Sequence, residues 1–504
     1  MLVLVLAIIA ALSFSVFSFS ETTLNDYEAM RSSVDQVQLR AAAASGIAAV
    51  RTRLAADDLT MPPRSGVVVR EPGESVSYAI VASLEAAADK DAPALFDESA
   101  RFNPNALSLK PSRLRESRER LLALPGLTPD IASGLLGWMS RPDELTKTNP
   151  ATTVDPDEPP RRRFRRLDEL LEVSGLTPAL LYGADRNANG LRDPDELESR
   201  DGRLDRGLSE LMTVTAWEST IAPTGEAKID LNRRDLAGLY DTLRARMPRE
   251  IALFVVASRC APLDYDNEAA PRPVDADSER LARLDSAAER LRRQLGPATD
   301  DEAAQVNARD LVRDGLPLPI DPPFRLESLL SLAGGKIQIR IADEDRLLRS
   351  PWAADAGGIE RLLTQLEPIA TAVSGPGNRH EGRINIQFAP LPVLRTIPGM
   401  SESLARAILA RRRPQSRDQQ TIAWLARESL VTPAELRRLA PYITVRGSVW
   451  SGVALGLREG RTAAAPTAFV VARRGPTTDL LQQTDLPMIP FSSAWSTPAG
   501  GPTR

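Results

Sequence analysis

The chain is poor in the side chains that catalysis and metal clusters most often use. Among its 504 residues there is one cysteine, Cys260, and one histidine, His380. A single cysteine cannot form an internal disulfide, and no cluster of cysteine and histidine ligands can hold zinc. Nucleophilic catalysis with a histidine base would have to use His380, which lies in the polar stretch GPGNRHEGR and which we interpret as an ordinary surface residue. The composition therefore argues against an enzyme.

Aromatic residues are also scarce, and the chain has no excess of positive charge. Aromatic side chains make up 5% of the chain, the formal net charge is −4 and the isoelectric point is near 5.6. No global positive field therefore draws the protein to nucleic acid. Proline, by contrast, is abundant, at 40 residues, which indicates many turns and linkers between short helices. A chain of this length can form about two to four domains with sizeable cores.

Charged side chains are missing from the N-terminus. Residues Leu2–Phe19 form a run of 18 residues without a charge, about the minimum for a membrane-spanning helix. A cleaved secretory signal is one alternative, but the sequence shows neither its charged n-region nor an A-x-A site. A buried core helix is the second alternative, but the position of the apolar run at the extreme N-terminus of a polar chain argues against it. We therefore expect a transmembrane anchor at residues 1–20.

The pattern after the anchor remains helical to Asp58 and then changes to strands. Apolar or small side chains recur every three or four residues, at Leu24, Tyr27, Met30, Val34, Val37, Ala41, Ala44, Ile47, Val50 and Leu54. Two strand-like runs follow a proline-containing turn, Val67–Val69 and Val76–Ala82. The C-terminal part again contains strand-like segments between glycine turns: Tyr442–Val449, Ser451–Gly460 and Thr467–Gly475. We expect one small antiparallel sheet at the two ends of a helical middle.

One polar segment has the spacing of a calcium-binding loop. The stretch ADRNANGLRDPDE, residues 184–196, follows the pattern D-x-[DN]-x-[DN]-G-x5-E. Calcium takes oxygen ligands, and the loop offers Asp185, Asn187, Asn189, the Leu191 carbonyl, Asp193 and a bidentate Glu196. A second acidic cluster, ESRDGRLD, offers Glu198, Asp201 and Asp205 for another ion. A polar surface loop with an accidental spacing is the alternative.

The surroundings of this loop favour structural calcium over a switch. No helical pattern follows Glu196, and Gly202 interrupts the acidic cluster, so a paired EF-hand is not expected. An extracytoplasmic calcium site would bind the ion with a dissociation constant on the order of 10⁻⁴ to 10⁻³ M. Metal-dependent catalysis would need an open coordination position beside an acid or base in a cleft, and no such arrangement is visible in the sequence.

Three segments of the middle share one pattern, a short strand or turn with Asn or Asp followed by two short helices. They are Arg101–Met139, Lys228–Arg259 and Arg383–Arg413. The turns LPGLTPD, VSGLTPA and IPGMSES each supply a glycine that ends one helix and a hydroxyl that caps the next. Such units resemble helix–hairpin–helix elements, which often bind DNA phosphates through the amides of a G-h-G turn. Here Thr128, Thr177 and Ser401 replace the second glycine, and we interpret the hairpins as structural.

Two arginine-rich runs are the best case for nucleic acid, Arg161–Arg166 and Ala410–Pro414. A solvated helix face is the alternative for both. The sequence thus predicts an α+β protein with a transmembrane anchor (1–20), a helix and first strands (21–100), an inserted helical region with hairpin repeats and the calcium loop (101–440), C-terminal strands (441–475) and a flexible tail (476–504).

Five segments together resemble one known family over most of the chain. They are RAAAASGIAAV (Arg40–Val50), LPGLTPDIASGLLGWMSRPDE (Leu124–Glu144), LDELLEVSGLTPALLYGADRNANGLRDPDE (Leu167–Glu196), RINIQFAPLPVLRTIPGMSESLARAIL (Arg383–Leu409) and LRRLAPYITV (Leu436–Val445). With the apolar N-terminal helix, they resemble the K-family minor pseudopilins of the type II secretion system, general secretion pathway protein K.

The resemblance implies a fold, a place and a role. The fold would be a pilin-like long helix packed on a small antiparallel sheet, with a large inserted α-helical domain that contains helix–hairpin–helix-like (SAM-like) units and structural calcium. The protein would be a single-pass inner-membrane protein with most of the chain in the periplasm, processed by the prepilin peptidase where a basic leader precedes the helix. It would form a complex with the I- and J-type minor pseudopilins at the pseudopilus tip, initiate assembly and support secretion without catalysis. A membrane-anchored DNA-binding protein that uses the hairpins is the alternative function.

Overall fold

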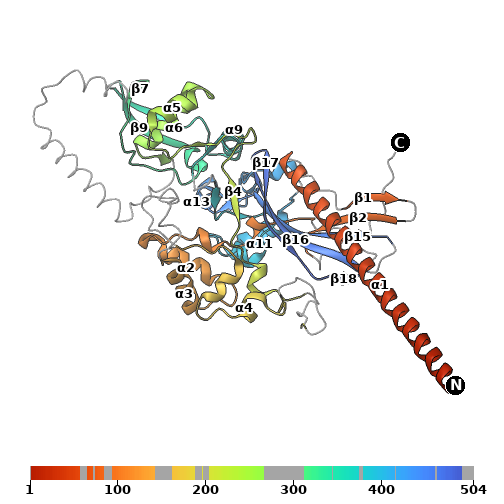
Figure 1. Cartoon of the computed structure of the whole chain (residues 1–504). Coiled ribbons are helices and arrows are strands. Elements are labelled where there is room, and N and C mark those ends of the chain that lie inside the picture. The colour runs from red at the N-terminus through yellow and green to blue at the C-terminus, as the bar shows by residue number, and fades with distance from the viewer. Residues whose placement is uncertain are drawn as a thin grey trace, which may run out of the picture. The chain divides into compact units, whose positions relative to one another are not determined.

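The chain combines helices and sheets in two compact units (Figure 1). The computed structural model describes residues 2–56, 65–71, 74–83, 94–141, 162–187, 196, 204–265, 312–342, 344–373, 379–414, 416–459 and 463–490. Unit 1 comprises residues 1–97, 182–207 and 449–504, and unit 2 comprises residues 98–181 and 208–448. The mixture of helix and sheet confirms the predicted α+β class.

Unit 1 contains one long helix and one antiparallel sheet. Its elements are α1 (Leu2–Ala55), β1 (Ser65–Glu71), β2 (Glu74–Val81), β3 (Phe96–Asp97), β15 (Val449–Arg458), β16 (Ala463–Arg474), β17 (Thr477–Asp485) and β18 (Ile489–Pro490). The strand order is β1-β2-β15-β16-β17, β3 pairs with β15, and β18 pairs with β16. Because β2 and β15 are direct neighbours, with Ile80 opposite Ala454, strands from the two ends of the chain complete one sheet.

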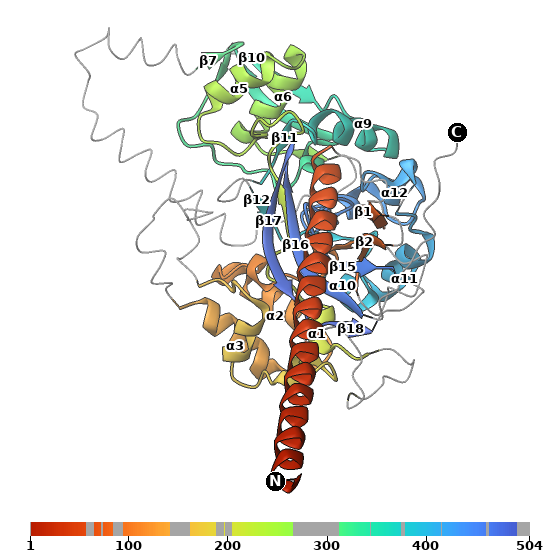
Figure 2. The ribbon, with the colours of Figure 1, turned by 45° about the vertical axis from the view of Figure 1, so that its right-hand side comes forward.

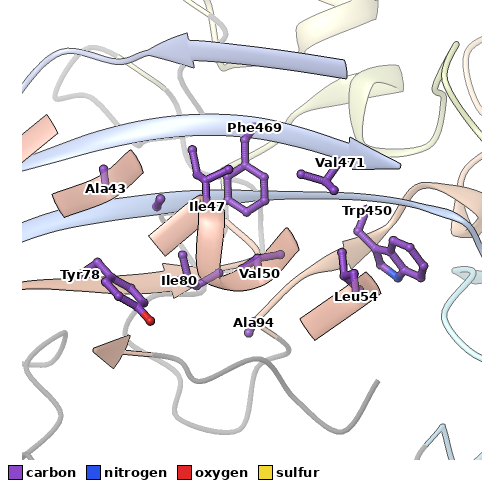
Figure 3. Close-up of a cluster of buried hydrophobic side chains, with 11 residues drawn as sticks. Ala43, Ile47, Val50, Leu54, Tyr78, Ile80, Ala94, Trp450, Phe469 and Val471 are labelled. Carbon is purple, nitrogen blue, oxygen red and sulfur yellow. The ribbon is translucent and has the colours of Figure 1, made fainter. Parts of the chain in front are cut away.

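The C-terminal half of α1 packs on one face of this sheet (Figures 2 and 3). Ala43, Ile47, Val50 and Leu54 are buried, and their spacing of three or four residues places them on one side of the helix. The sheet contributes Tyr78, Ile80, Trp450, Ala454, Phe469 and Val471 to the same core. Of the recurring apolar or small positions expected on this helix, Ile47, Val50 and Leu54 are buried, and the others are exposed: Leu24, Tyr27, Met30, Val34, Val37, Ala41 and Ala44. Ala42 and Ala43, which are not part of that pattern, are buried.

The preceding part of α1 exposes large apolar side chains. They include Leu12, Phe14, Val16, Phe17, Phe19, Leu24, Tyr27, Met30, Val34 and Val37. Among the described residues, no helix is both long and apolar enough to cross a membrane. The predicted anchor falls partly outside that set, because the side chains of residues 1–8 and 10 are not described.

Unit 2 consists of short helices and small sheets. Its α-helices are α2 (Leu114–Leu122), α3 (Pro129–Met139), α4 (Pro178–Tyr182, whose last residue belongs to unit 1), α5 (Leu236–Arg244), α6 (Arg249–Cys260), α9 (Ala356–Leu366), α10 (Leu391–Leu394), α11 (Glu402–Arg411), α12 (Trp424–Arg427) and α13 (Pro433–Leu439). Its 3-10 helices are η2 (Glu98–Ala100), η3 (Pro104–Ala106), η4 (Pro111–Arg113), η7 (Leu167–Glu172), η8 (Gly207–Glu210, whose first residue belongs to unit 1), η9 (Leu329–Leu332) and η10 (Arg417–Gln419).

The strands of unit 2 are short. They are β4 (Trp217–Ser219), β5 (Ile229–Asp230), β6 (Asp264–Tyr265), β7 (Val312–Arg313), β8 (Leu316–Pro317), β9 (Gly335–Ile341), β10 (Glu344–Arg349), β11 (Ala370–Thr371), β12 (Arg379–Glu381), β13 (Ile384–Asn385) and β14 (Ile443–Thr444). They form the sheets β10-β9-β6, β11-β5, β12-β4, β13-β14 and β7-β8. The β11-β5 and β13-β14 pairs are parallel.

In each repeated segment, the side-chain amide of an Asn or Gln makes hydrogen bonds to backbone groups that are far away in the sequence. In the first, Asn105 Nδ2 donates to the Phe164 carbonyl at 2.8 Å, and Phe164 N donates to Asn105 Oδ1 at 2.9 Å. In the second, Asn232 makes the same pair of bonds with Leu326, at 2.8 and 2.9 Å. In the third, Gln387 Nε2 donates to the carbonyl of Gln419 at 3.3 Å. The resemblance among the repeats therefore extends to their long-range hydrogen bonds.

The hairpin turns have the predicted glycine and cap chemistry. Gly126 and Gly175 have φ values of 78° and 90°, a region that favours glycine. Thr128 Oγ1 accepts a hydrogen bond from Ile131 N at 3.3 Å and so caps α3. A fourth turn, ESLVTPAE, was missed in the sequence, because Ser429 replaces the glycine there with a φ of 56°.

Two predicted boundaries were wrong. Residues 477–485, expected in the flexible tail, form β17, which pairs with β16. Polar contacts with α1 hold this edge strand: Arg51 Nη2 donates to the Thr478 carbonyl at 3.0 Å, and Arg40 pairs with Asp485 at 2.9 Å. The calcium loop, expected in the helical insertion, falls within unit 1.

Candidate functional site

The two ends of the predicted calcium loop meet in unit 1. Arg186 N donates to Glu196 Oε1 at 3.0 Å, so the last predicted ligand is bound to the backbone of the residue after the first, Asp185. The Asp205 carbonyl accepts hydrogen bonds from Ala184 N at 2.7 Å and from Asp185 N at 3.4 Å. Gly183, with a φ of 64°, permits this approach, since a Cβ there would lie 2.5 Å from the Asp205 carbonyl oxygen.

Two of the predicted ligands are buried carboxylates. Asp185 is 1% exposed and Glu196 is 7% exposed. Burial of two negative charges is costly unless cations or hydrogen bonds compensate. Arg206 provides part of this compensation, with its Nε 3.7 Å from Asp185 Oδ2. Carboxylate oxygens are ligands of the kind that calcium takes.

The structure describes only some of the other predicted ligands. Asn187 is exposed, and Asp205 Oδ1 accepts a hydrogen bond from Gly207 N at 2.9 Å. Asn189, Leu191, Asp193, Glu198 and Asp201 lie outside the described residues. Within the part of the chain that the structure describes, no group of three or more His, Cys, Asp or Glu side chains could hold a metal ion. The calcium set thus stays a prediction: its two terminal carboxylates are buried, and most of the ligands between them lie outside the described residues.

A second candidate site is a polar pocket in unit 2 that the sequence did not reveal. Its volume is about 460 Å³, including space open to solvent. The ionisable side chains that line it are Glu218, Lys228, Glu327, Glu367, His380 and Arg383. Arg383 Nη1 lies 3.4 Å from Glu218 Oε2. Burial raises the pKa of Glu218, and burial lowers the pKa of Lys228.

His380 is not the surface residue that we expected. It lies in β12, directly opposite Glu218 of β4, and residues opposite each other in a ladder share one face of the sheet. Burial, with smaller effects of Arg383 and Lys228, lowers the pKa of His380 from 6.5 to about 3. The imidazole therefore remains neutral at neutral pH. The residues around His380 look like an exposed polar loop in the sequence. Its burial follows from pairing with β4, which is distant in the sequence.

This pKa makes stability depend on pH. Between pH 6.5 and 3 the unfolded chain binds a proton at His380 that the folded chain does not, so folding free energy is lost as the pH falls, by at most about 1.4 kcal/mol per pH unit. His380→Gln should remove this loss. Urea unfolding from pH 7.5 to 4 should show a wild-type advantage over the variant that is constant above about pH 6.5 and shrinks below it. Glu218, whose raised pKa acts in the opposite direction, is common to both proteins, and parallel profiles would contradict the assignment.

The arginine-rich runs are largely engaged within the protein. Arg162 lies 4.0 Å above the Trp138 ring and pairs with Glu172 at 3.1 Å. Arg163 pairs with Glu381, and Arg166 pairs with Asp168. In the second run, Arg411 Nη1 and Arg412 Nη1 donate to the Glu428 and Ala389 carbonyls, at 3.1 and 2.7 Å. These contacts favour a structural role for both runs.

No protein-family model, curated protein or solved structure matches the chain.

Proposed function

We propose that this protein is a K-type minor pseudopilin that acts at the tip of a type II secretion pseudopilus. The observation that carries the proposal is the joining of β2 and β15 beneath α1. A long N-terminal helix on an antiparallel sheet that is interrupted by a large insertion is the pilin-like arrangement that the resemblance implies. The hairpin units of the insertion would be its SAM-like elements.

The exposed part of α1 supports assembly as the role. Its side chains between Leu12 and Val37 include large apolar residues on several sides of the helix. Apolar surface of this extent requires an apolar environment or partner helices. The inner membrane would supply the apolar environment for the start of the helix, with the rest of the chain in the periplasm. The helices of the I- and J-type minor pseudopilins would be the partner helices.

Two substitutions on α1 test this assembly role. Met30→Glu and Val34→Glu should abolish complementation of secretion in a host that lacks the native gene, because charge on this face opposes helix packing. Ser32→Glu, at an exposed position on the opposite side of α1, is the control for charge alone and should retain more activity. Limited proteolysis should show that the sheet of unit 1 remains folded in all three variants. Full complementation by Met30→Glu and Val34→Glu would contradict the role of this face.

Calcium would be a structural ion in this protein. Asp185 and Glu196 would hold it together with the loop residues between them, and the ion would neutralise the buried carboxylates and fix the loop. At about 5 mM calcium, a dissociation constant on the order of 10⁻⁴ to 10⁻³ M corresponds to about 1–2 kcal/mol of added stability.

Substitution of a terminal ligand tests the calcium site. Asp185→Asn and Glu196→Gln should each remove most of the calcium-dependent rise in melting temperature, because each loses a charged ligand. The measurement is thermal unfolding in EDTA and in calcium, with Asp479→Asn of β17 as the control for loss of one carboxylate. An equal calcium response in wild type and both loop variants would count against the site.

DNA binding by the hairpins is the alternative function. It is disfavoured because the hydroxyls of Thr128, Thr177 and Ser401 already accept hydrogen bonds from helix N-terminal amides, the groups that would otherwise bind phosphate. A gel-shift experiment with double-stranded DNA at low salt separates the two functions. We expect no shift at micromolar protein, and strong salt-dependent binding would favour the alternative.

A further inference from the structure

Two opposite charges line the polar pocket of unit 2 without pairing with each other. They are the Lys228 ammonium and the Glu367 carboxylate, and every residue described around the pocket belongs to unit 2. Burial lowers the pKa of Lys228, and the attraction of Glu367 offsets only part of that effect. Within the described part of the chain, neither charged group has an ion-pair or hydrogen-bond partner. Because burying a charge without a partner is costly, both groups favour a bound partner.

Two further polar atoms of the pocket are buried and have no hydrogen-bond partner among the described residues. They are Ser328 Oγ and Arg383 Nε, and both residues line the pocket. Ser328 is 7% exposed, so bulk solvent does not reach its hydroxyl freely. Buried polar groups in native proteins nearly always have a partner. These two donors therefore indicate that a molecule in the pocket binds them.

The size and walls of the pocket limit this molecule. The volume of about 460 Å³ includes space open to solvent, so the molecule that fits has only a few non-hydrogen atoms. The apolar part of the wall comes mainly from short side chains, among them Ala370, Ala372 and Ala440. Pockets of this kind use a few polar groups to orient a ligand against apolar walls.

We propose that this pocket binds a small zwitterion of the free amino acid class. Its carboxylate would bind Lys228, Arg383 and the Ser328 hydroxyl, and its ammonium would bind Glu367. Two cations, Lys228 and Arg383, face two carboxylates, Glu218 and Glu367, so a ligand that carries both charges matches the pocket better than a simple anion or cation. The inference is independent of the proposed role in secretion.

The experiment is isothermal calorimetry of the full-length protein in detergent micelles at constant ionic strength. The probes are glycine, L-alanine and β-alanine, and the comparison compounds are acetate and ethylammonium, which each carry one of the two charges. We expect saturable binding of at least one amino acid with a dissociation constant of roughly 1 mM or tighter. Acetate and ethylammonium should each bind at least about tenfold more weakly, because each lacks one charged contact.

Three variants place the binding in the pocket. Lys228→Met, which keeps the aliphatic stem, should weaken amino acid binding at least about tenfold. Ser328→Ala should weaken binding about threefold or more without lowering the melting temperature of the free protein, because this hydroxyl has no partner to lose. Glu327→Gln is the control: this residue also lines the pocket, but its side chain is 67% exposed and pairs with Arg113, so binding should change by about twofold or less.

Three results would overturn the inference. Binding of acetate or ethylammonium as tight as that of the amino acids would show a site for a single charge. Equal affinities in wild type, Lys228→Met and Ser328→Ala would place the bound molecule outside the pocket. No binding of any of the three amino acids at about 20 mM would mean that ordered water alone satisfies the pocket.

Discussion

Replacing Gly456 with alanine should detach helix α1 from its sheet and destabilise unit 1 by at least about 3 kcal/mol. A Cβ at this position would lie 1.8 Å from the carbonyl oxygen of Leu39 and 2.5 Å from its carbonyl carbon. Both atoms belong to the backbone of α1 and cannot rotate away, so the helix must move off β15. We expect a fall in melting temperature of roughly 10 °C, measured by calorimetry.

Two other glycines provide graded controls. A Cβ at Gly452, on the same strand, would have no heavy atom closer than 3.1 Å, and the nearest is the tip of a side chain, so Gly452→Ala should cost less. Gly137 in α3 has nothing within 4 Å, and Gly137→Ala should raise stability by up to about 1 kcal/mol, as expected for helical glycine. Similar losses at Gly456 and Gly452 would show that α1 does not lie against β15 as described.

Replacing Asn105 with alanine should have a comparably large effect, a loss of about 3–5 kcal/mol from unit 2. Asn105 is 1% exposed, and its amide bonds both backbone groups of Phe164 as well as the Val214 carbonyl, at 3.3 Å. Phe164 is itself 2% exposed, so water cannot easily replace the lost partners. The measurement is urea unfolding followed by tryptophan fluorescence, because Trp138 stacks on the Phe164 ring at 3.9 Å.

The second repeat supplies the matched control. Asn232 makes the equivalent pair of bonds to Leu326 but is only partly buried, so solvent can reach its partners after truncation. Asn232→Ala should therefore cost about half as much as Asn105→Ala. We expect the burial of the amide, and not the pattern of its hydrogen bonds, to determine its contribution to stability. A larger loss of stability at Asn232 than at Asn105 would contradict this.

Local chemistry in this chain could be predicted from the sequence, whereas long-range packing could not. The glycine turns and hydroxyl caps were found because a few adjacent residues determine them. The recurrence at Ala41 and Ala44 does not mark the buried face of α1, because alanines occupy several sides of the helix there, and the backbone of α1 meets Gly456 of the sheet at close range.

The candidate sites show the same division. The calcium spacing was visible because its ligands lie within one segment, but Arg206 falls outside the motif and its pairing with Asp185 depends on the hydrogen bonds of Asp205. The environment of His380 was missed because it is created by β4, more than a hundred residues earlier in the chain. Strand pairing at that separation leaves no periodic signal in the sequence.

The most direct test of the proposed function is assembly with the other minor pseudopilins. Periplasmic regions of the I- and J-type subunits from the same organism should be co-expressed with this protein, purified through a tag on one subunit, and sized by light scattering. The proposal predicts a stable complex that contains all three chains. Three folded, soluble proteins that elute separately at micromolar concentration would contradict it.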